Sequence, residues 1–141
     1  MHPTDANCVF CKIVAGQIPS FRLYEDDDTI AFMDINPVND GHALAVVKGH
    51  YPNLHAIPAD VLGKVAATAQ RIARAQQAAL NPSGINLLQA NGPGAGQTVF
   101  HLHFHVLPRT AQDDDLKVNW GHNPGDMARI KQIHEKLLKA M

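Results

Sequence analysis

The sequence contains only two cysteines in 141 residues, Cys8 and Cys11, and these are too close together to cross-link distant parts of a fold. This scarcity argues against a disulfide-stapled secreted domain. The sequence also lacks the run of about 20 apolar residues that a membrane-spanning helix requires. Residues 1–7 are polar and do not resemble a signal peptide. These absences predict a cytoplasmic protein without a membrane partner.

Basic residues are scarce as well. Lysine and arginine number 12 against 13 acidic residues, the net charge is −1, and no basic block stands out. Because a duplex-binding surface normally carries a stripe of lysine and arginine, we expect no nucleic-acid partner. A single nucleotide needs only a few donors, so that class of ligand is compatible with the composition.

The length fits one domain over residues 1–141. Helical spacing of apolar residues predicts a long helix over Pro58–Leu80 and a final helix that starts near Pro124 with Asn123 as its N-cap. Alternating or continuous apolar runs predict five strands, at Phe21–Glu25, Thr29–Met33, His42–Val47, Ile85–Gln89 and Val99–Leu107. Strands that follow one another with only two helices indicate an α+β fold with a mostly antiparallel sheet.

The most informative segment is the last predicted strand, because every second residue in it is a histidine. Side chains alternate between the two faces of a strand. His101, His103 and His105 are therefore expected on one face, while Phe100, Leu102, Phe104 and Val106 share the other and enter the core. A solvent-facing strand that happens to be rich in histidine is the alternative interpretation.

A glycine-rich loop, residues 92–96, leads directly into this strand. Glycines allow backbone N–H groups to converge on an anion, and Gln97 and Thr98 add side-chain donors beside them. Imidazoles near neutral pH act as nucleophiles, acids or bases. The combination predicts a phosphate site next to reactive histidines.

The run from Gly96 to Val106 resembles the signature of the histidine triad (HIT) family, in which histidines alternate with apolar residues. The resemblance covers nearly the whole chain. Cys8–Ile13 with Gly16–Ser20 looks like the N-terminal part of bacterial members, and Phe32–Pro37 with Gly41-His42 resembles the nucleoside-binding strands. Leu107-Pro108-Arg109 is similar to the end of the triad strand in the bacterial and dinucleoside-polyphosphate-cleaving branches. The resemblance implies a HIT-like fold with a five-stranded, mostly antiparallel sheet, one long helix and a C-terminal helix within residues 120–141.

The resemblance also implies roles for the histidines. In this family the middle histidine, here His103, attacks the α-phosphorus and forms a nucleotidyl-histidine intermediate that water later hydrolyses. His105 would bind a phosphate oxygen, and His42 would support His105 from a neighbouring strand. Gln97 and Thr98 would hold the phosphate and the leaving group.

For the nucleoside, the resemblance implies that Phe32 and Ile35 grip a purine base and that Asp34 accepts hydrogen bonds from the ribose hydroxyls. Asn91 is a weaker candidate, because the register of the loop around Gln89 and Asn91 is open. The alternatives are core packing for Phe32 and Ile35 and a turn-forming role for Asp34.

The spacing of Cys8 and Cys11 is typical of a zinc knuckle within the N-terminal segment, residues 1–20. The zinc-containing members of the family use two cysteines and two histidines, which implies His50 and His101 as the remaining ligands of a structural zinc ion. A redox dithiol and a free pair of surface cysteines are the alternatives.

Three functions are compatible with these residues. The first is hydrolysis of the P–N bond of a nucleoside 5′-phosphoramidate, such as adenylate joined to an amine. The second is cleavage of dinucleoside polyphosphates, in which Arg109 would meet the additional phosphates. The third is a non-catalytic, zinc-stabilised, nucleotide-binding interaction module. By analogy with the family, we expect a homodimer.

Overall fold

The structure is a computed structural model, and it describes residues 1–110, 114, 116–118 and 121–141. The described residues form five strands, three α-helices and one short 3₁₀ helix. Their order along the chain is α1 (Val9–Val14), β1 (Arg22–Glu25), β2 (Thr29–Met33), β3 (Ala43–Val47), α2 (Ala59–Leu80), β4 (Gly84–Leu88), η1 (Pro93–Ala95), β5 (His103–Arg109) and α3 (Met127–Ala140).

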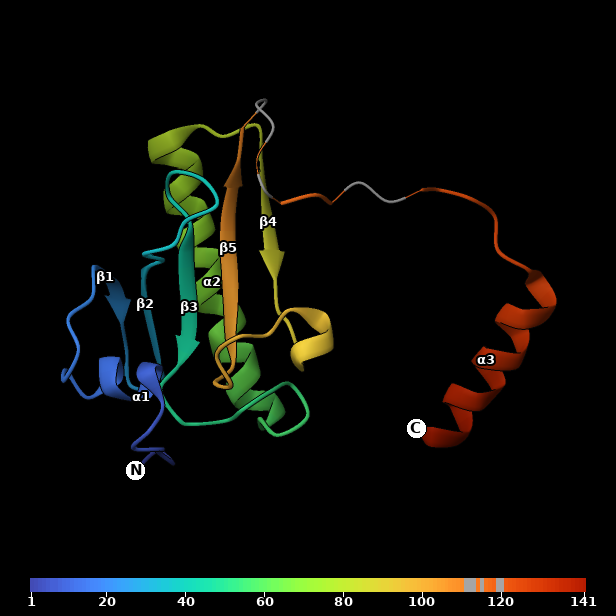
Figure 1. The fold of residues 1–141 in the computed structure, drawn as a ribbon, viewed down its shortest axis with the longest axis horizontal. Coiled ribbons are helices and arrows are strands. Elements are labelled where there is room, and N and C mark those ends of the chain that lie inside the picture. The colour runs from blue at the N-terminus through green and yellow to red at the C-terminus, as the bar shows by residue number, and fades with distance from the viewer. Residues whose placement is uncertain (111–113, 115, 119–120) are drawn as a thin grey trace.

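The strands form one sheet in the order β1-β2-β3-β5-β4, and every neighbouring pair is antiparallel. The predicted α+β class and five-stranded antiparallel sheet are therefore confirmed. Four of the predicted strands differ from the observed ones by at most one residue at each end. In Figure 1, α2 lies behind the sheet and α1 lies in front of its lower edge.

Small side chains allow α2 to pack closely against one face of the sheet. Ala31, Ala43 and Ala45 all have no exposed surface, and they lie in one cluster with Val65 and Ala69 of α2. The apolar stripe predicted on this helix is thus its buried face. Pro58 is the N-cap in extended conformation rather than a residue of the first turn.

The opposite face of the sheet carries larger side chains and is covered by α1. Phe10 and Ile13 of this short helix pack against neighbouring residues of β2 and β3, which are Ile30, Phe32, Leu44 and Val46. The helix is only six residues long, so it depends on this packing and on its flanking contacts rather than on its own helical propensity. One end of the sheet is thereby closed by the segment that carries both cysteines.

The predicted strand Val99–Leu107 is wrong at both ends, because β5 runs from His103 to Arg109. Before His103, the backbone N–H of Leu102 donates to the carbonyl of Tyr51 at 2.7 Å and not to the sheet. At the other end, Pro108 does not stop the strand. The Pro108 carbonyl accepts a hydrogen bond from the Asn39 side chain. Because the nitrogen and carbonyl of one strand residue point to the same side, the Pro108 nitrogen faces the side where pairing with β3 has already ended, and no sheet hydrogen bond is lost there.

The C-terminal helix also begins later than predicted. Asp126, not Asn123, is the N-cap, because its carboxylate accepts hydrogen bonds from the N–H groups of Ala128 and Arg129. Figure 1 places α3 well away from the sheet, beyond β4. Among the described residues, no helix combines the length and hydrophobicity that a membrane span requires.

Candidate functional site

The strand register places two of the histidines on the α1 face of the sheet. In the antiparallel ladder His103 lies opposite Val46, and His105 lies opposite Leu44. Directly opposed residues share a face, so both imidazoles join the face on which Phe32 packs. His42 precedes Leu44 by two residues and extends the same row. The sheet therefore brings His42 together with His103 and His105, which lie far from it in the sequence.

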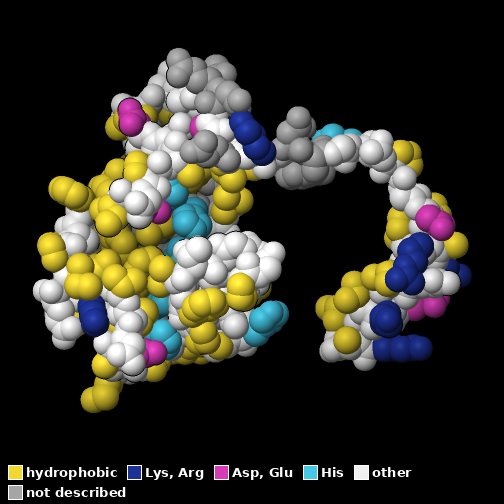
Figure 2. Space-filling view, viewed as in Figure 1, with side chains coloured by type: hydrophobic (Ala, Val, Ile, Leu, Met, Phe, Trp, Pro, Cys, Tyr) yellow, Lys and Arg dark blue, Asp and Glu magenta, His cyan; other side chains and the backbone are white. Residues whose placement is uncertain are grey.

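These histidines line a cavity of about 510 Å³ on this face. Figure 2 shows histidine side chains in the hollow between a hydrophobic surface and the loop that follows β4. The walls are mostly apolar, and the polar groups converge on one side, as is usual for small-molecule sites. Predicted site residues that line this cavity are Phe32, Asp34, Ile35, His42, Thr98, His103 and His105.

His103 is held in one orientation by its own strand. Its Nδ1 lies 2.7 Å from the carbonyl oxygen of His101, and the side chain is only 9% exposed. A carbonyl accepts and cannot donate, so Nδ1 carries the proton and Nε2 keeps its lone pair. In this tautomer, the imidazole presents an unprotonated nitrogen on the ring's other side.

His42 and His105 form a hydrogen-bonded pair. The N–H of Val38 donates to His42 Nδ1 at 3.1 Å, so the proton of the neutral ring is on Nε2. That Nε2 lies 2.9 Å from His105 Nδ1 and 3.4 Å from the Asp34 carboxylate. His105 accepts at Nδ1 and therefore carries its own proton on Nε2. His105 is thus left with an N–H donor at Nε2, whereas His103 has an acceptor at Nε2.

Burial favours the neutral form of these rings. Desolvation lowers the pKa of His103, and it lowers the pKa of His105 to about 4 with help from the nearby His103 and His42. Desolvation also lowers the pKa of His42, against the opposing effect of the Asp34 carboxylate. At pH 7 the site therefore offers neutral imidazoles, the form required for a nitrogen nucleophile.

The residues predicted to bind the nucleoside lie at the mouth and floor of the cavity. Phe32 is 3% exposed, and its ring lies edge-on to Phe10 with centroids 5.5 Å apart. Ile35 is 78% exposed at the rim. Asp34 lies between them in sequence and lines the cavity. An apolar floor, an open apolar rim and a carboxylate between them provide surfaces for a base and for hydroxyl groups.

The structure places Gln97 and Asn91 differently from Thr98. Thr98 lines the cavity, but the Gln97 amide is bound to backbone groups of Pro52, Val99 and Gly92, with donor–acceptor distances of 2.6, 3.2 and 2.8 Å. Asn91 exchanges hydrogen bonds with Gln89 and accepts from the N–H of Leu54. Gln97 and Asn91 thus fix the shape of the loop in this structure, and their predicted contacts with a nucleotide stay predictions.

Phe10 belongs to the site, although the sequence analysis did not predict it. Its ring packs edge-on against His103 at a centroid distance of 5.0 Å and against His101 at 5.9 Å. Val9, Ile13 and Ile18 line the same cavity. The available signal was the position of Phe10 between the two cysteines, because a metal ligand pair fixes the residues it encloses.

The four predicted metal ligands come together next to the cavity. The ligand atoms of Cys8, Cys11, His50 and His101 all lie within 4.8 Å of one another. His101 Nδ1 is 3.4 Å from the Cys8 sulfur and 3.5 Å from the Cys11 sulfur, and His50 Nδ1 is 3.4 Å from the Cys11 sulfur. Tetrahedral zinc with standard bond lengths separates sulfur and nitrogen ligands by about 3.5 Å. The donor set and its spacing therefore fit zinc.

Polar groups of the protein face the second nitrogen of each histidine ring in this cluster. His101 Nε2 lies 2.6 Å from the carbonyl of Val47, so its proton is there and Nδ1 points its lone pair at the sulfurs. His50 Nε2 lies 3.8 Å from the Asp5 carboxylate. Since the carbonyl of His101 also orients His103, one residue connects the metal cluster with the candidate nucleophile.

Asp34, His42 and His105 form a second group of side chains that are close enough to hold a metal ion. Two imidazole ligands of one zinc ion are about 3.3 Å apart, whereas His42 and His105 are separated by 2.9 Å. The shorter distance is that of a direct hydrogen bond, so this group is a proton-bearing network.

Arg109 is engaged by the chain that follows it. Its guanidinium donates to both carboxylate oxygens of Asp114 at 3.0 Å, to Asn86 and to the carbonyl of Leu116. This arrangement satisfies the guanidinium within the protein. Arg109 therefore fixes the segment after β5 and is not directed at the cavity.

Comparison with known proteins identifies the family. The sequence pattern of the HIT domain matches residues 15–112. The chain is 38% identical to Protein hit of Bacillus subtilis over 143 residues, covering 98% of each sequence. It is 40% identical over 134 residues to adenosine 5′-monophosphoramidase HNT1 of Saccharomyces cerevisiae, which covers 95% of this chain and 82% of the yeast protein.

Solved structures agree with this assignment. A HIT family protein from Bacillus anthracis has a TM-score of 0.90 at 38% identity, with 98% of this chain and 99% of that chain covered. A zinc-bound histidine triad family protein from Mycobacterium smegmatis has a TM-score of 0.74 at 36% identity, with coverages of 95% and 96%. The triad strand, the cavity it lines and these relatives lead to one conclusion, which is that the chain belongs to the histidine triad family.

Proposed function

We propose that the chain is a nucleotide hydrolase that cleaves the P–N bond of nucleoside 5′-phosphoramidates, with His103 as its nucleophile. The observation that carries the proposal is the contact between His103 Nδ1 and the carbonyl of His101, because it leaves the Nε2 lone pair free inside a cavity of nucleotide size. Relatives named adenosine 5′-monophosphoramidase favour a phosphoramidate over other nucleotide substrates.

The reaction proceeds in two displacements at phosphorus. His103 Nε2 forms a bond to the α-phosphorus as the P–N bond breaks, and the leaving nitrogen takes up one proton from solvent and departs as the amine; the later attack of water returns one proton to solvent. Water then attacks the nucleotidyl-histidine, which releases the nucleoside monophosphate and returns His103 to its neutral form. No oxidant or reductant is needed.

His105 and His42 have complementary roles in this reaction. The His42 Nε2–H group faces His105 Nδ1, which keeps the His105 proton on Nε2. That proton is available to a phosphate oxygen, whose negative charge increases as His103 attacks. Thr98 adds a hydroxyl group at the cavity wall, near where the leaving group departs.

The nucleoside part of the substrate occupies the apolar side of the cavity. Phe32 and Ile35 contact the purine base, and Asp34 accepts hydrogen bonds from the ribose hydroxyls. A carboxylate that meets both hydroxyls distinguishes ribose from deoxyribose, because deoxyribose lacks one of the donors.

Cleavage of dinucleoside polyphosphates is the less favoured activity. It depended on Arg109 as a donor to additional phosphates, and this guanidinium is bound to Asp114, Asn86 and Leu116. A comparison of kcat/KM for an adenosine phosphoramidate and for a dinucleoside polyphosphate separates the two activities.

We further propose that Cys8, Cys11, His50 and His101 hold a structural zinc ion. The close spacing of their ligand atoms and the zinc-bound relative support this assignment over a redox dithiol. The ion would tie α1 to the start of β5, and α1 carries Phe10, which packs on His103. Two further expectations, a homodimer and a cytoplasmic location, remain part of the proposal.

The experiment is to measure kcat/KM for adenosine 5′-phosphoramidate with the wild type, His103→Ala and the control His55→Ala. His55 is exposed and lies outside the cavity. Loss of the nucleophile should lower kcat/KM by on the order of 10⁴-fold, and the control should retain wild-type activity. Tight binding of adenosine monophosphate without turnover by the wild type would instead favour a non-catalytic binding module.

A further inference from the structure

The C-terminal helix α3 exposes an apolar stripe. Met127, Ile130 and Leu137 are 75%, 50% and 59% exposed, and no residue of this helix is buried. Figure 2 shows hydrophobic side chains along one side of α3 and basic side chains along another. An amphipathic helix normally buries such a stripe, so this surface requires a partner.

The position of α3 is shared with solved relatives. The helix holds 14 of the chain's 141 residues. A superposition without it would reach a TM-score of 0.90 only if every other residue coincided, and it could not reach 0.92, yet two crystal structures have these TM-scores. In those relatives the equivalent helix therefore also stands away from its own sheet. An extended position that recurs in crystals indicates that α3 packs on something other than the sheet beside it.

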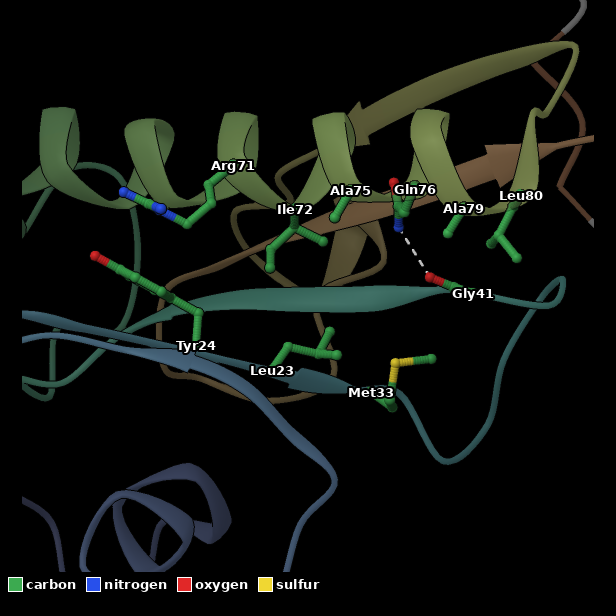
Figure 3. A pocket seen from close by; sticks show the side chains of 10 residues that line it. All are labelled: Leu23, Tyr24, Met33, Gly41, Arg71, Ile72, Ala75, Gln76, Ala79 and Leu80. Atoms are coloured by element: carbon green, nitrogen blue, oxygen red, sulfur yellow. Dashed lines mark hydrogen bonds between the residues drawn. The ribbon is translucent and has the colours of Figure 1, made fainter.

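The chain has an apolar groove of suitable form between α2 and β1, which we call the α2–β1 groove. Its volume is about 560 Å³, and Figure 3 shows side chains from the helix and from the strands facing each other across it. It is lined by Leu23, Tyr24, Met33, Gly41, Arg71, Ile72, Ala75, Gln76, Ala79 and Leu80. Ala75 and Ala79 stand one turn apart, which makes the helix side shallow enough for a second helix to approach.

The groove is already formed in the structure. Gln76 donates to the carbonyls of Gly41 and Val106 at 2.8 and 2.9 Å, which fixes α2 to the sheet along the groove. At one end the guanidinium of Arg71 stacks on the Tyr24 ring at 4.5 Å. Docking of a helix would therefore require little rearrangement.

The dimensions of α3 match this groove, and acidic residues stand near both ends of the groove. From Arg71 to Leu80 the groove follows α2 for about 14 Å, and the stripe from Met127 to Leu137 spans about 15 Å at 1.5 Å per residue. Four basic residues and one acidic residue give α3 a positive charge. The groove has acidic neighbours at both ends, Asp40 before Gly41 and Asp26 beside Tyr24.

We propose that α3 of one chain docks in the α2–β1 groove of a second copy, so that two chains exchange their C-terminal helices. The groove belongs to the β1 end of the sheet, whereas α3 projects past β4 at the other end. A second sheet placed beside β4 presents its own groove in the direction in which α3 projects. The proposal adds a defined contact to the expected homodimer and is independent of the catalytic activity.

The test is a disulfide cross-link between chains that each carry one new cysteine. Ala79→Cys is mixed with Ile133→Cys, and the control mixture combines Ala79→Cys with Gln132→Cys, since Gln132 lies on the opposite side of α3. Mild oxidation should give a band at the mass of two different chains with Ile133→Cys and at least about 10-fold less with Gln132→Cys. Wild-type protein controls for Cys8 and Cys11.

Two outcomes would overturn the proposal. The first is equal cross-linking of Ile133→Cys and Gln132→Cys, because it would mean that the stripe does not face the groove. The second is a double variant, Ala79→Cys with Ile133→Cys, that forms its bond only within single chains, because it would place α3 in its own groove. Activity on the phosphoramidate substrate is measured separately and does not affect this result.

Discussion

His42 Nε2 lies 2.9 Å from His105 Nδ1, and this contact joins the residue before β3 to the middle of β5. The two residues are 63 positions apart in the sequence. The N–H of Val38 fixes the His42 tautomer from the other side. A backbone group is thus connected through two imidazoles to the His105 nitrogen that would face the phosphate.

Replacement of His42 tests this network. Without the His42 donor, His105 loses its fixed tautomer, and a lost buried hydrogen bond of about 1–3 kcal/mol corresponds to a kcat/KM about 5- to 150-fold lower. We therefore expect His42→Ala to lower kcat/KM within this range with little change in binding of adenosine monophosphate. In a His105→Ala background the same replacement should have little additional effect. Additive losses would show that His42 acts independently of His105.

The pH dependence follows from burial of the histidines. Because desolvation lowers the pKa of His103 and brings that of His105 to about 4, both rings keep their lone pairs below the ordinary value of 6.5. We expect kcat/KM to be constant near neutrality and to fall on the acid side with a midpoint below pH 6.5. Between about pH 6.5 and 4 the unfolded chain binds more protons at His105 than the folded one, so folding stability also falls as pH falls.

The measurement is kcat/KM from about pH 4 to 8, with circular dichroism at each pH to separate unfolding from titration. A midpoint at or above 6.5 in folded protein would mean that the rate-determining imidazole is not desolvated.

Asp34 should determine the preference for ribose. The wild type is expected to favour an adenosine phosphoramidate over its 2′-deoxy analogue, because the deoxy sugar leaves a carboxylate oxygen without one of its donors. Asp34→Ala should reduce this preference, mainly through KM for the ribose substrate. The Asp34 carboxylate also lies 3.4 Å from His42, so kcat is measured as well. An unchanged ratio between the two substrates in Asp34→Ala would remove Asp34 from the sugar contact.

Metal removal should destabilise the fold at its N-terminal end. Structural zinc contributes several kcal/mol, so a chelator should lower Tm by at least about 10 °C. Burial raises the pKa of the Cys8 thiol, so metal binding should release protons and weaken at low pH. Elemental analysis should find one zinc per wild-type chain, a loss of zinc in Cys11→Ser and no loss in the control His55→Ala. Purified protein without zinc and with a Tm insensitive to chelator would contradict the zinc assignment.

The sequence predicted the elements whose residues follow one clear period. The stripe on α2 and the strand around Leu44 and Val46 are simple patterns of this kind, and the structure confirms them. The four predicted ligands also come together. The spacing of Cys8 and Cys11 indicated a metal knuckle, whereas His50 and His101 were implied by the family resemblance. Local periodicity carries this information because burial on one face determines it.

The alternation of histidines was misleading at its start. His101 and Leu102 are both buried, and Phe100 is 50% exposed, although the strand pattern placed Phe100 in the core. The reason is tertiary, because the carbonyl of Tyr51 binds the Leu102 N–H and that of Val47 binds the His101 ring. No pattern within the strand records these contacts. The contact of Phe10 with His103 is tertiary as well, and the position of Phe10 between the two cysteines was the only signal for it in the sequence.

The most direct test of the central claim is intact-mass analysis of the protein after brief reaction with adenosine 5′-phosphoramidate. The account predicts a transient mass increase of one adenylate on the wild type, located on His103 by peptide mapping and absent in His103→Ala. Turnover by the wild type without any adduct, or an adduct that persists in His103→Ala, would contradict it.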